Sequence, residues 1–274
     1  MKITCELCPH HCMLSEGQVG FCKARSCFNG KIICDNYGKI TSIAIDPIEK
    51  KTLMNFYPGS NILSIGSYGC NLHCPFCQNS DISQEVCTRI IELSPKQLIK
   101  TALEYVDKYN NIGIAYTYNE PFISYEYVYD CARLAHEHDL KNVFITNGMI
   151  CEEPLKKILP YIDAMNVDLK GFTQKFYDMV KGYLETVKNT IRIASKSCHV
   201  EVTTLIIPCE NDSDNEIAAI SKWLSEIDKN IPYHISRFFP IYQMTDKHPT
   251  PVKTIYHLAE VARKNLVNVY TGNC

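Results

Sequence analysis

The sequence lacks any uninterrupted apolar run of about 18 residues, the length at which a helix can cross a bilayer. It also lacks the apolar segment of a signal peptide, because Met1–Thr4 lead directly into Cys5. Neither charge is in excess, since 28 basic against 30 acidic residues give a net charge of -2, and this argues against nucleic-acid or membrane partners. A charged content of 21% and an apolar content of 46% exclude a disordered chain. We therefore expect a folded, cytoplasmic protein.

Cysteine, in contrast, is abundant: the chain has 15, and nine of them lie in the first 77 residues. A cytoplasmic thiol pool keeps structural disulfides reduced, so clustered cysteines are expected to bind metal or to carry out chemistry. Residues 1 to about 30 show little apolar periodicity, which predicts a cysteine-rich extension ordered by a metal. Residues 31–45 predict two short strands around an Asn36-Tyr37-Gly38 turn.

From residue 60 onward, short β-rich runs alternate with helical patterns. The expected strands are 61–66, 112–118, 142–145, 163–169, 200–207, 233–238 and 267–270. A first helix is expected to begin at Ser94-Pro95, and the others cover 123–138, 152–159, 173–197, 212–229 and 251–265. With no Gly-x-Gly-x-x-Gly turn, this alternation predicts an α/β fold, a partial (β/α)6-type TIM barrel of six to seven strands. We expect two units, a cysteine-rich cap with a short hairpin over 1–59 and the barrel over 60–274.

Three cysteines lie within eight residues, directly after the first barrel strand: Cys70, Cys74 and Cys77. Three thiolates can hold three irons of a four-iron cluster, which leaves the fourth iron open to a small molecule. The alternative is a zinc knuckle completed by His73 or by a distant cysteine. The position of the loop favours the cluster, because barrel enzymes carry out their chemistry at the carboxyl ends of the strands.

The spacing of this triplet, with Phe76 just before its last cysteine, resembles the signature of radical S-adenosylmethionine (SAM) enzymes. The string 64–71, followed after the triplet by Gln78-Asn79, resembles the branch that contains pyruvate formate-lyase activating enzymes. The cysteine pattern of residues 5–22 and the strings 46–51 and 116–121 resemble the radical enzyme of the AmmeMemoRadiSam system. The resemblance implies a [4Fe-4S] cluster on Cys70, Cys74 and Cys77, and SAM as cofactor.

Polar residues follow the expected strands at the barrel mouth. The resemblance implies that the segment at Asn119-Glu120 accepts hydrogen bonds from the methionyl amino group, and that Phe76 borders the adenine. It also implies polar contacts to the carboxylate and ribose from the later strands. The expected cofactor-binding set is Phe76, Gln78, Asn79, Asn119, Glu120, Thr146, Asn147, Asp168, Lys170 and His234. The ordinary alternative for the Asp-x-Lys pair is a surface ion pair, and for an isolated histidine a packing role.

The cysteines of the extension form a second candidate site. Cys5, Cys8, Cys12 and Cys22 offer four thiolates, enough for a tetrahedral zinc or a second iron–sulfur cluster. Their spacing does not decide between these metals. An extended arm of reduced thiols without metal is the alternative.

The resemblance also implies the reaction. One electron cleaves SAM to a 5′-deoxyadenosyl radical that abstracts hydrogen from the substrate, without a protein acid–base pair. We expect a peptide or protein substrate, because the strings are activating-enzyme-like and the gap of an incomplete barrel could admit a polypeptide loop. Two hypotheses for this substrate compete: activation of a glycyl-radical enzyme, and modification of another partner, of Memo type or AMMECR type. A ferredoxin- or flavodoxin-type protein is expected to donate the electrons. The alternative from another class is a non-catalytic iron–sulfur or zinc protein that serves as a scaffold or electron relay.

Overall fold

The computed structural model describes residues 2–85 and 89–274. The strands of its large sheet are β6 (Ser42–Pro47), β7 (Asn61–Gly66), β9 (Asn111–Tyr116), β10 (Lys141–Thr146), β11 (Ala164–Asp168), β12 (His199–Ile206), β13 (Tyr233–Arg237) and β14 (Val269–Gly272). The helices are α1 (Ser80–Ser83), α2 (Pro95–Tyr109), α3 (Tyr125–Glu137), α4 (Glu152–Ile158), α5 (Gln174–Met179), α6 (Leu184–Ala194), α7 (Asp214–Asp228) and α8 (Val252–Ala262), with 3₁₀ turns at Ile48–Lys51, Pro121–Ser124 and Leu159–Tyr161. The smaller strands are β1 (Ile3–Thr4), β2 (Met13–Leu14), β3 (Arg25–Phe28), β4 (Lys31–Cys34), β5 (Lys39–Ile40) and β8 (Ile91–Glu92).

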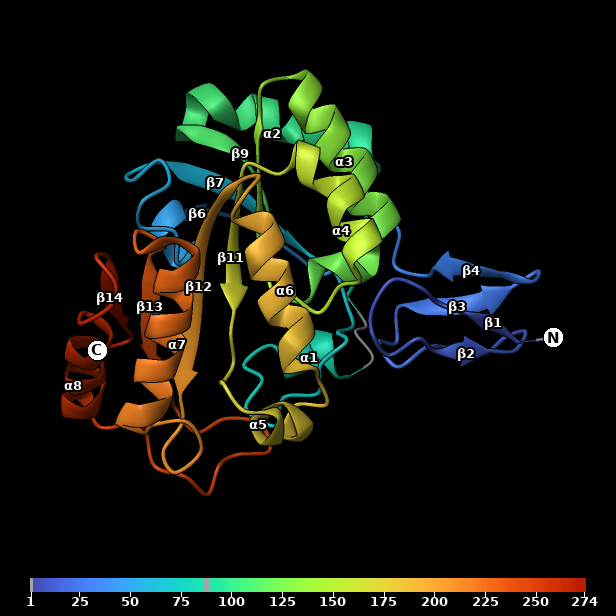
Figure 1. Ribbon diagram of the computed structural model, residues 1–274. Coiled ribbons are helices and arrows are strands. Elements are labelled where there is room, and N and C mark those ends of the chain that lie inside the picture. The colour runs from blue at the N-terminus through green and yellow to red at the C-terminus, as the bar shows by residue number, and fades with distance from the viewer. Residues whose placement is uncertain (1, 86–88) are drawn as a thin grey trace.

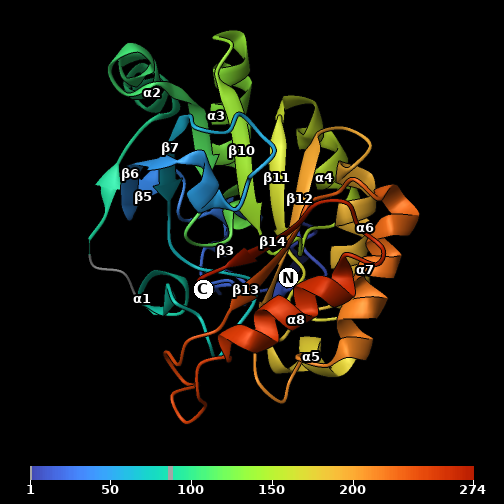
Figure 2. The same ribbon diagram turned by 90° about the vertical axis from the view of Figure 1, so that its left-hand side faces the viewer.

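The large sheet has the order β14-β13-β12-β11-β10-β9-β7-β6 within the described residues (Figure 1). In this sheet β7 and β9–β14 run parallel to one another, whereas β6 pairs antiparallel with β7 at one edge. Helices cover the outer face of the curved sheet (Figure 2). The predicted α/β fold, a partial barrel with six to seven parallel strands, is therefore confirmed.

Local signals explain where the helices begin. At the start of α2, the Ser94 side chain accepts a hydrogen bond from the Gln97 backbone, and the Gln97 side chain accepts one from the Ser94 backbone. This capping box satisfies two backbone donors, and Pro95 occupies the first helical position, where its missing N–H costs nothing. The expected start of this helix is confirmed.

The single helix expected over 173–197 is wrong, because the chain forms α5 and α6 with a break between them. Lys181 has a φ of +60°, which no right-handed helix accommodates. A Cβ at the next residue, Gly182, would lie 2.6 Å from Leu72 Cδ2. The break therefore lets the backbone approach the loop that carries Leu72, which belongs to the cysteine triplet.

The two short strands expected around the Asn36 turn are present as β4 and β5, but they do not pair with each other. β4 pairs with β3 across Asn29-Gly30, β5 pairs with β8, and β6 joins the large sheet. The pattern located strands on both sides of the Asn36 turn but did not show their partners. The separate unit over 1–59 stays a prediction, and β6 already extends the sheet of the barrel. The extension with β1–β4 projects from one side of the barrel, beside α3 and α4 (Figure 1).

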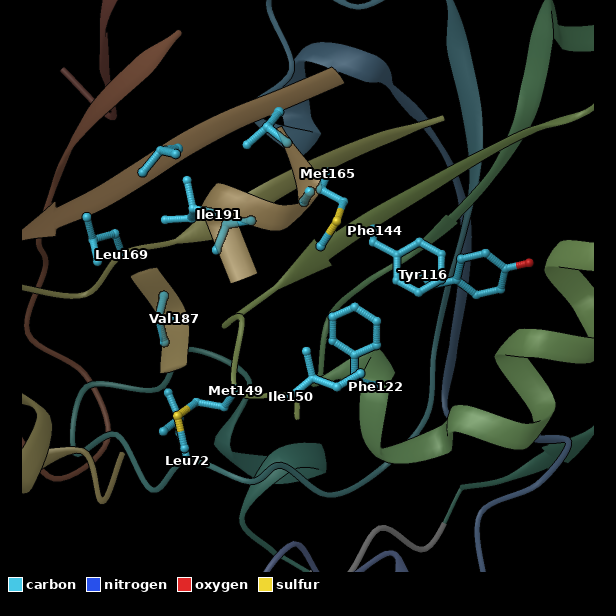
Figure 3. Packing of buried hydrophobic residues seen from close by; sticks show 14 of the residues in the cluster. Leu72, Tyr116, Phe122, Phe144, Met149, Ile150, Met165, Leu169, Val187 and Ile191 are labelled. Atoms are coloured by element: carbon cyan, nitrogen blue, oxygen red, sulfur yellow. The ribbon is translucent and has the colours of Figure 1, made fainter. Parts of the chain in front are cut away.

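The main core lies between the sheet and its outer helices. Phe144 and Met165 point from the strands toward the helices, and Val187 and Ile191 come from α6 (Figure 3). Leu72, 1% exposed, lies at the edge of the same cluster. Burial of a leucine side chain contributes about 1.5–3 kcal/mol, so the cysteine loop is fixed by the core of the barrel.

Candidate functional site

The triplet loop between β7 and α1 is anchored on both sides of Leu72. The Asn71 amide donates from Nδ2 to the Met149 carbonyl at 2.6 Å, and Asn71 is 1% exposed. The His73 backbone donates to the Val180 carbonyl at 2.9 Å. Because these bonds are made by buried backbone and amide groups, the loop is held in one conformation. Asn71 was missed as a site residue, although its place inside the motif was a signal.

Cys70, Cys74 and Cys77 are free thiols, with Cys74 buried and the other two half-buried. Burial raises the pKa of Cys74 to about 12 and that of Cys70 well above its ordinary value, with the other cysteines of the triplet adding like-charge repulsion. Over 2–85 and 89–274, no three His, Cys, Asp or Glu side chains converge as the ligands of a single ion would. A four-iron cluster has no such requirement, because each thiolate binds a different iron. The donor set therefore fits three irons of a cluster.

The ends of β9 and β10 form a hydrogen-bonded group beside Cys70. Thr146 Oγ1 donates to Glu120 Oε1 at 2.7 Å, and the Asn147 backbone donates to Glu120 Oε2 at 2.8 Å. Asn147 Nδ2 donates to Cys70 Sγ at 3.5 Å and to Asn71 Oδ1 at 2.9 Å. Glu120 therefore aligns Asn147 with the triplet loop.

The buried Glu120 carboxyl, 2% exposed, has its pKa raised to about 7, mainly because burial disfavours the charged form. The hydrogen bonds from Asn147, Phe122 and Thr146 act in the opposite direction. A carboxyl with this pKa is poised near neutrality, which is frequent at functional sites.

Other predicted residues line the same loop. Asn119 Nδ2 donates to the Gly69 carbonyl at 3.1 Å, and Asn79 Nδ2 donates to the Tyr118 carbonyl at 2.7 Å. Phe76 is buried, with its ring 6.2 Å from that of Phe176, and Gln78 is exposed. Contact of these side chains with a cofactor stays a prediction.

Asp168, the last residue of β11, forms an ion pair with Lys170 just beyond the strand, with Lys170 Nζ 2.6 Å from Asp168 Oδ2. The pair is not on the open surface, because the Lys170 side chain is only 17% exposed. The Asp168 carboxylate and the nearby Cys74 thiol raise the pKa of Lys170, although burial opposes this. A fixed positive charge beside Cys74 stabilises its thiolate form.

His234 is not brought to this group. It is the second residue of β13, and its Nε2 lies 2.5 Å from Glu201 Oε2. Glu201 also accepts hydrogen bonds from the Met54 and Asn55 backbone, in the segment that joins β6 to β7. This segment covers the amino-terminal end of the barrel strands, opposite the triplet loop. His234 therefore has a hydrogen-bond partner, Glu201, at the end of the barrel opposite the triplet loop.

Four of the six cysteines in the extension line one small cavity. Cys5, Cys8, Cys12 and Cys22 share its wall with Arg25 and neighbouring apolar side chains. Burial raises the pKa of Cys8 to about 12 and that of Cys22 to about 11. His10, which also lines the cavity, bonds to the Asn71 carbonyl at 2.8 Å. Grouping of these cysteines agrees with a common site, whereas their binding of a metal stays a prediction.

The fold and this rim define a class: partial-barrel proteins with a three-cysteine loop at the carboxyl end of the first parallel strand. Residues 64–224, more than half of the chain, match the Radical SAM superfamily. The chain belongs to this family and is an enzyme of the radical SAM type, and the family implies a [4Fe-4S] cluster and SAM. No helix in the described part of the chain is long and apolar enough to cross a membrane.

The similar proteins agree with this assignment. An uncharacterised protein of Methanocaldococcus jannaschii is 42% identical over 279 residues, which cover 99% of this chain and 81% of that protein. A second protein of the same organism, named as a candidate glycyl-radical enzyme activating enzyme, is 27% identical over 78% of this chain and 89% of its own length. The solved structure of Streptococcus suis SuiB bound to the precursor peptide SuiA has a TM-score of 0.58 at 14% identity, covering 83% of this chain and 51% of that one. At this identity the last likeness shows the fold alone.

Proposed function

We propose that this enzyme holds a [4Fe-4S] cluster on Cys70, Cys74 and Cys77 and uses it to cleave SAM for hydrogen abstraction from a peptide or protein. The observation that carries the proposal is the convergence of the triplet loop with the ends of β9, β10 and β11. When bound, the cluster and SAM supply a 5′-deoxyadenosyl radical from one electron.

The side chains of this rim have separate tasks. Asn147 donates to Cys70 Sγ, and a hydrogen bond to a ligand sulfur tunes the potential of a cluster. Lys170 offsets the negative charge of the thiolates near Cys74. Glu120, Asn119 and Asp168 provide acceptor oxygens for the polar groups of SAM, with Phe76 as an apolar neighbour. These assignments follow the family resemblance of the motifs.

The test of the activity is direct. Anaerobically reconstituted enzyme, given dithionite and SAM, should release 5′-deoxyadenosine and methionine. Cys74→Ala should release neither, whereas Cys209→Ala, at an exposed cysteine between β12 and α7, should behave as wild type. Absence of 5′-deoxyadenosine from a preparation with a full iron content would contradict the proposal.

A non-catalytic scaffold is the second candidate, and it predicts a fully ligated cluster. The electron paramagnetic resonance (EPR) signal of the reduced protein separates the two functions. SAM should change the signal if one iron is open, and should leave it unchanged if four protein ligands saturate the cluster.

A peptide or protein substrate is supported by the relative named as a candidate activating enzyme. Activation of a glycyl-radical enzyme and modification of a Memo-type or AMMECR-type partner, as in the AmmeMemoRadiSam system, are the two versions of this proposal. Anaerobic pull-down followed by mass spectrometry distinguishes them. The first predicts a glycyl radical in the captured partner, visible by EPR, and the second a residue-specific mass change.

A further inference from the structure

The cysteine cavity of the extension lies directly against the triplet loop. The Cys70 backbone donates to the Cys22 carbonyl at 3.2 Å, which joins a cysteine of each group through one hydrogen bond. The His10 ring bonds to the Asn71 carbonyl, one residue further along the triplet loop. The Phe21 ring stacks on His73 with a centroid distance of 4.0 Å, and it lies tilted against the His10 ring at 4.3 Å. The two cysteine groups are therefore connected by three adjacent contacts.

The backbone is adapted to this closeness at Gly69. Gly69 has a φ of +84°, and a Cβ at this position would lie 2.4 Å from the Cys22 carbonyl oxygen. No L side chain could be placed there without moving one of the loops. Ala24 and Ile123, both buried, close the junction around it. The contact is thus a built part of the fold.

The cavity chemistry favours a cluster over a single ion. Cys5, Cys8, Cys12 and Cys22 are four soft donors around one enclosed space, which suits zinc or iron–sulfur. Zinc would need the four sulfurs to converge tetrahedrally, and among the described side chains no three potential ligands do so. Four irons accept four separated thiolates.

We infer that Cys5, Cys8, Cys12 and Cys22 hold a second [4Fe-4S] cluster, which passes electrons to the triplet cluster across the Cys22–Cys70 contact. The inference rests on the proposed function for the role of the acceptor, but not for the metal site itself. A low-potential iron–sulfur or flavin protein is oxidised by one electron, and the second cluster is reduced from the 2+ to the 1+ state. It returns to 2+ as the triplet cluster takes the same electron.

The metal site is tested without enzyme activity, in the triple variant Cys70→Ala, Cys74→Ala, Cys77→Ala. After anaerobic reconstitution, this variant should retain about four irons and an EPR signal that SAM does not change, whereas wild type should contain about eight. Adding Cys8→Ala and Cys22→Ala should remove the remaining iron. Adding instead Cys34→Ser, a cysteine of the extension outside the cavity, should leave it in place. Zinc in the triple variant, or no metal in a protein whose circular dichroism is that of wild type, would overturn the inference.

The relay is tested by comparing two reductants in Cys8→Ala. The ratio of 5′-deoxyadenosine formed with a reduced flavodoxin to that formed with dithionite should fall well below the ratio in wild type and in Cys34→Ser. In wild type reduced at both centres, EPR should also show spin coupling that is lost in the triple variant. An unchanged ratio refutes the relay. Absence of product with dithionite in wild type would refute the proposed function instead, and the iron content of the triple variant would still decide the site.

Discussion

Glu201 is expected to make the free energy of unfolding fall at acid pH. Its side chain is fully buried and accepts hydrogen bonds from the Met54 and Asn55 backbone, at 3.0 and 2.8 Å. His199 and His234 approach its two oxygens at 2.9 and 2.5 Å. These bonds favour the charged form and lower the pKa of Glu201 to about 2, against an ordinary value of 4.5, although burial opposes them.

The size of the effect follows from this difference. At roughly 1.4 kcal/mol for each pH unit, the lowered pKa corresponds to roughly 3 kcal/mol of folding free energy. Because the pKa is lower in the folded state, this stabilisation is complete above about pH 5 and is lost as the pH falls toward 2. We expect Glu201→Gln to lower the free energy of unfolding by roughly 3 kcal/mol at pH 7. The loss should shrink progressively below pH 5.

The assay is urea unfolding of cluster-free protein from pH 2 to 7, followed by the fluorescence of Trp223. This is the single tryptophan of the chain, and it is buried on α7. Glu104→Gln is the matched control, because Glu104 is 59% exposed and its ion pair with Lys100 is at 3.9 Å. A difference between wild type and Glu201→Gln that is the same at every pH, or that Glu104→Gln reproduces, would refute the reasoning.

Three further predictions concern the site and its junction. Gly69→Ala should destabilise the protein by about 1–3 kcal/mol more than Gly17→Ala, as measured by denaturant midpoints. Both glycines have positive φ, but only at Gly69 would a Cβ lie 2.4 Å from a carbonyl oxygen. Arg25→Met breaks a bidentate ion pair with Glu126 at 2.6 Å and should lower the free energy of unfolding by about 2 kcal/mol. The loss should be seen as faster proteolysis within residues 2–34. The control Arg133→Met, at an exposed ion pair, should lower the free energy of unfolding by less than about 0.5 kcal/mol. Asn147→Ala removes the donor to Cys70 Sγ and should make the cluster potential more negative in an EPR-monitored titration; an unchanged potential would exclude that role.

Much of the barrel could be predicted because its signals are local. Alternating strand and helix patterns located every parallel strand of the described sheet, and Ser94-Pro95 located the start of α2. The same rule brought Glu120, Thr146 and Asn147 together, since the carboxyl ends of neighbouring parallel strands meet at one edge.

The errors came where long-range contacts override a local pattern. Residues 173–197 have helical character, but the break at Gly182 exists because Leu72, more than 100 positions away, needs the space. His234 was expected at the barrel mouth, but it lies near the start of its strand, where it bonds to Glu201. Direction within a strand is set by alternation, whereas depth in the barrel depends on where the strand begins.

The junction between the two cysteine groups was beyond prediction for a different reason: it is made mainly by backbone atoms. The Cys22 carbonyl, the Cys70 amide and the Asn71 carbonyl are present whatever side chains those positions carry. Spacing rules describe which thiols can reach a metal, and they carry no information on which carbonyl an amide meets. Gly69 is the exception, because a positive φ and a carbonyl at 2.4 Å restrict the residue itself. The proximity of the two thiol groups is therefore recorded in the sequence chiefly as a glycine that precedes the first cysteine of the triplet.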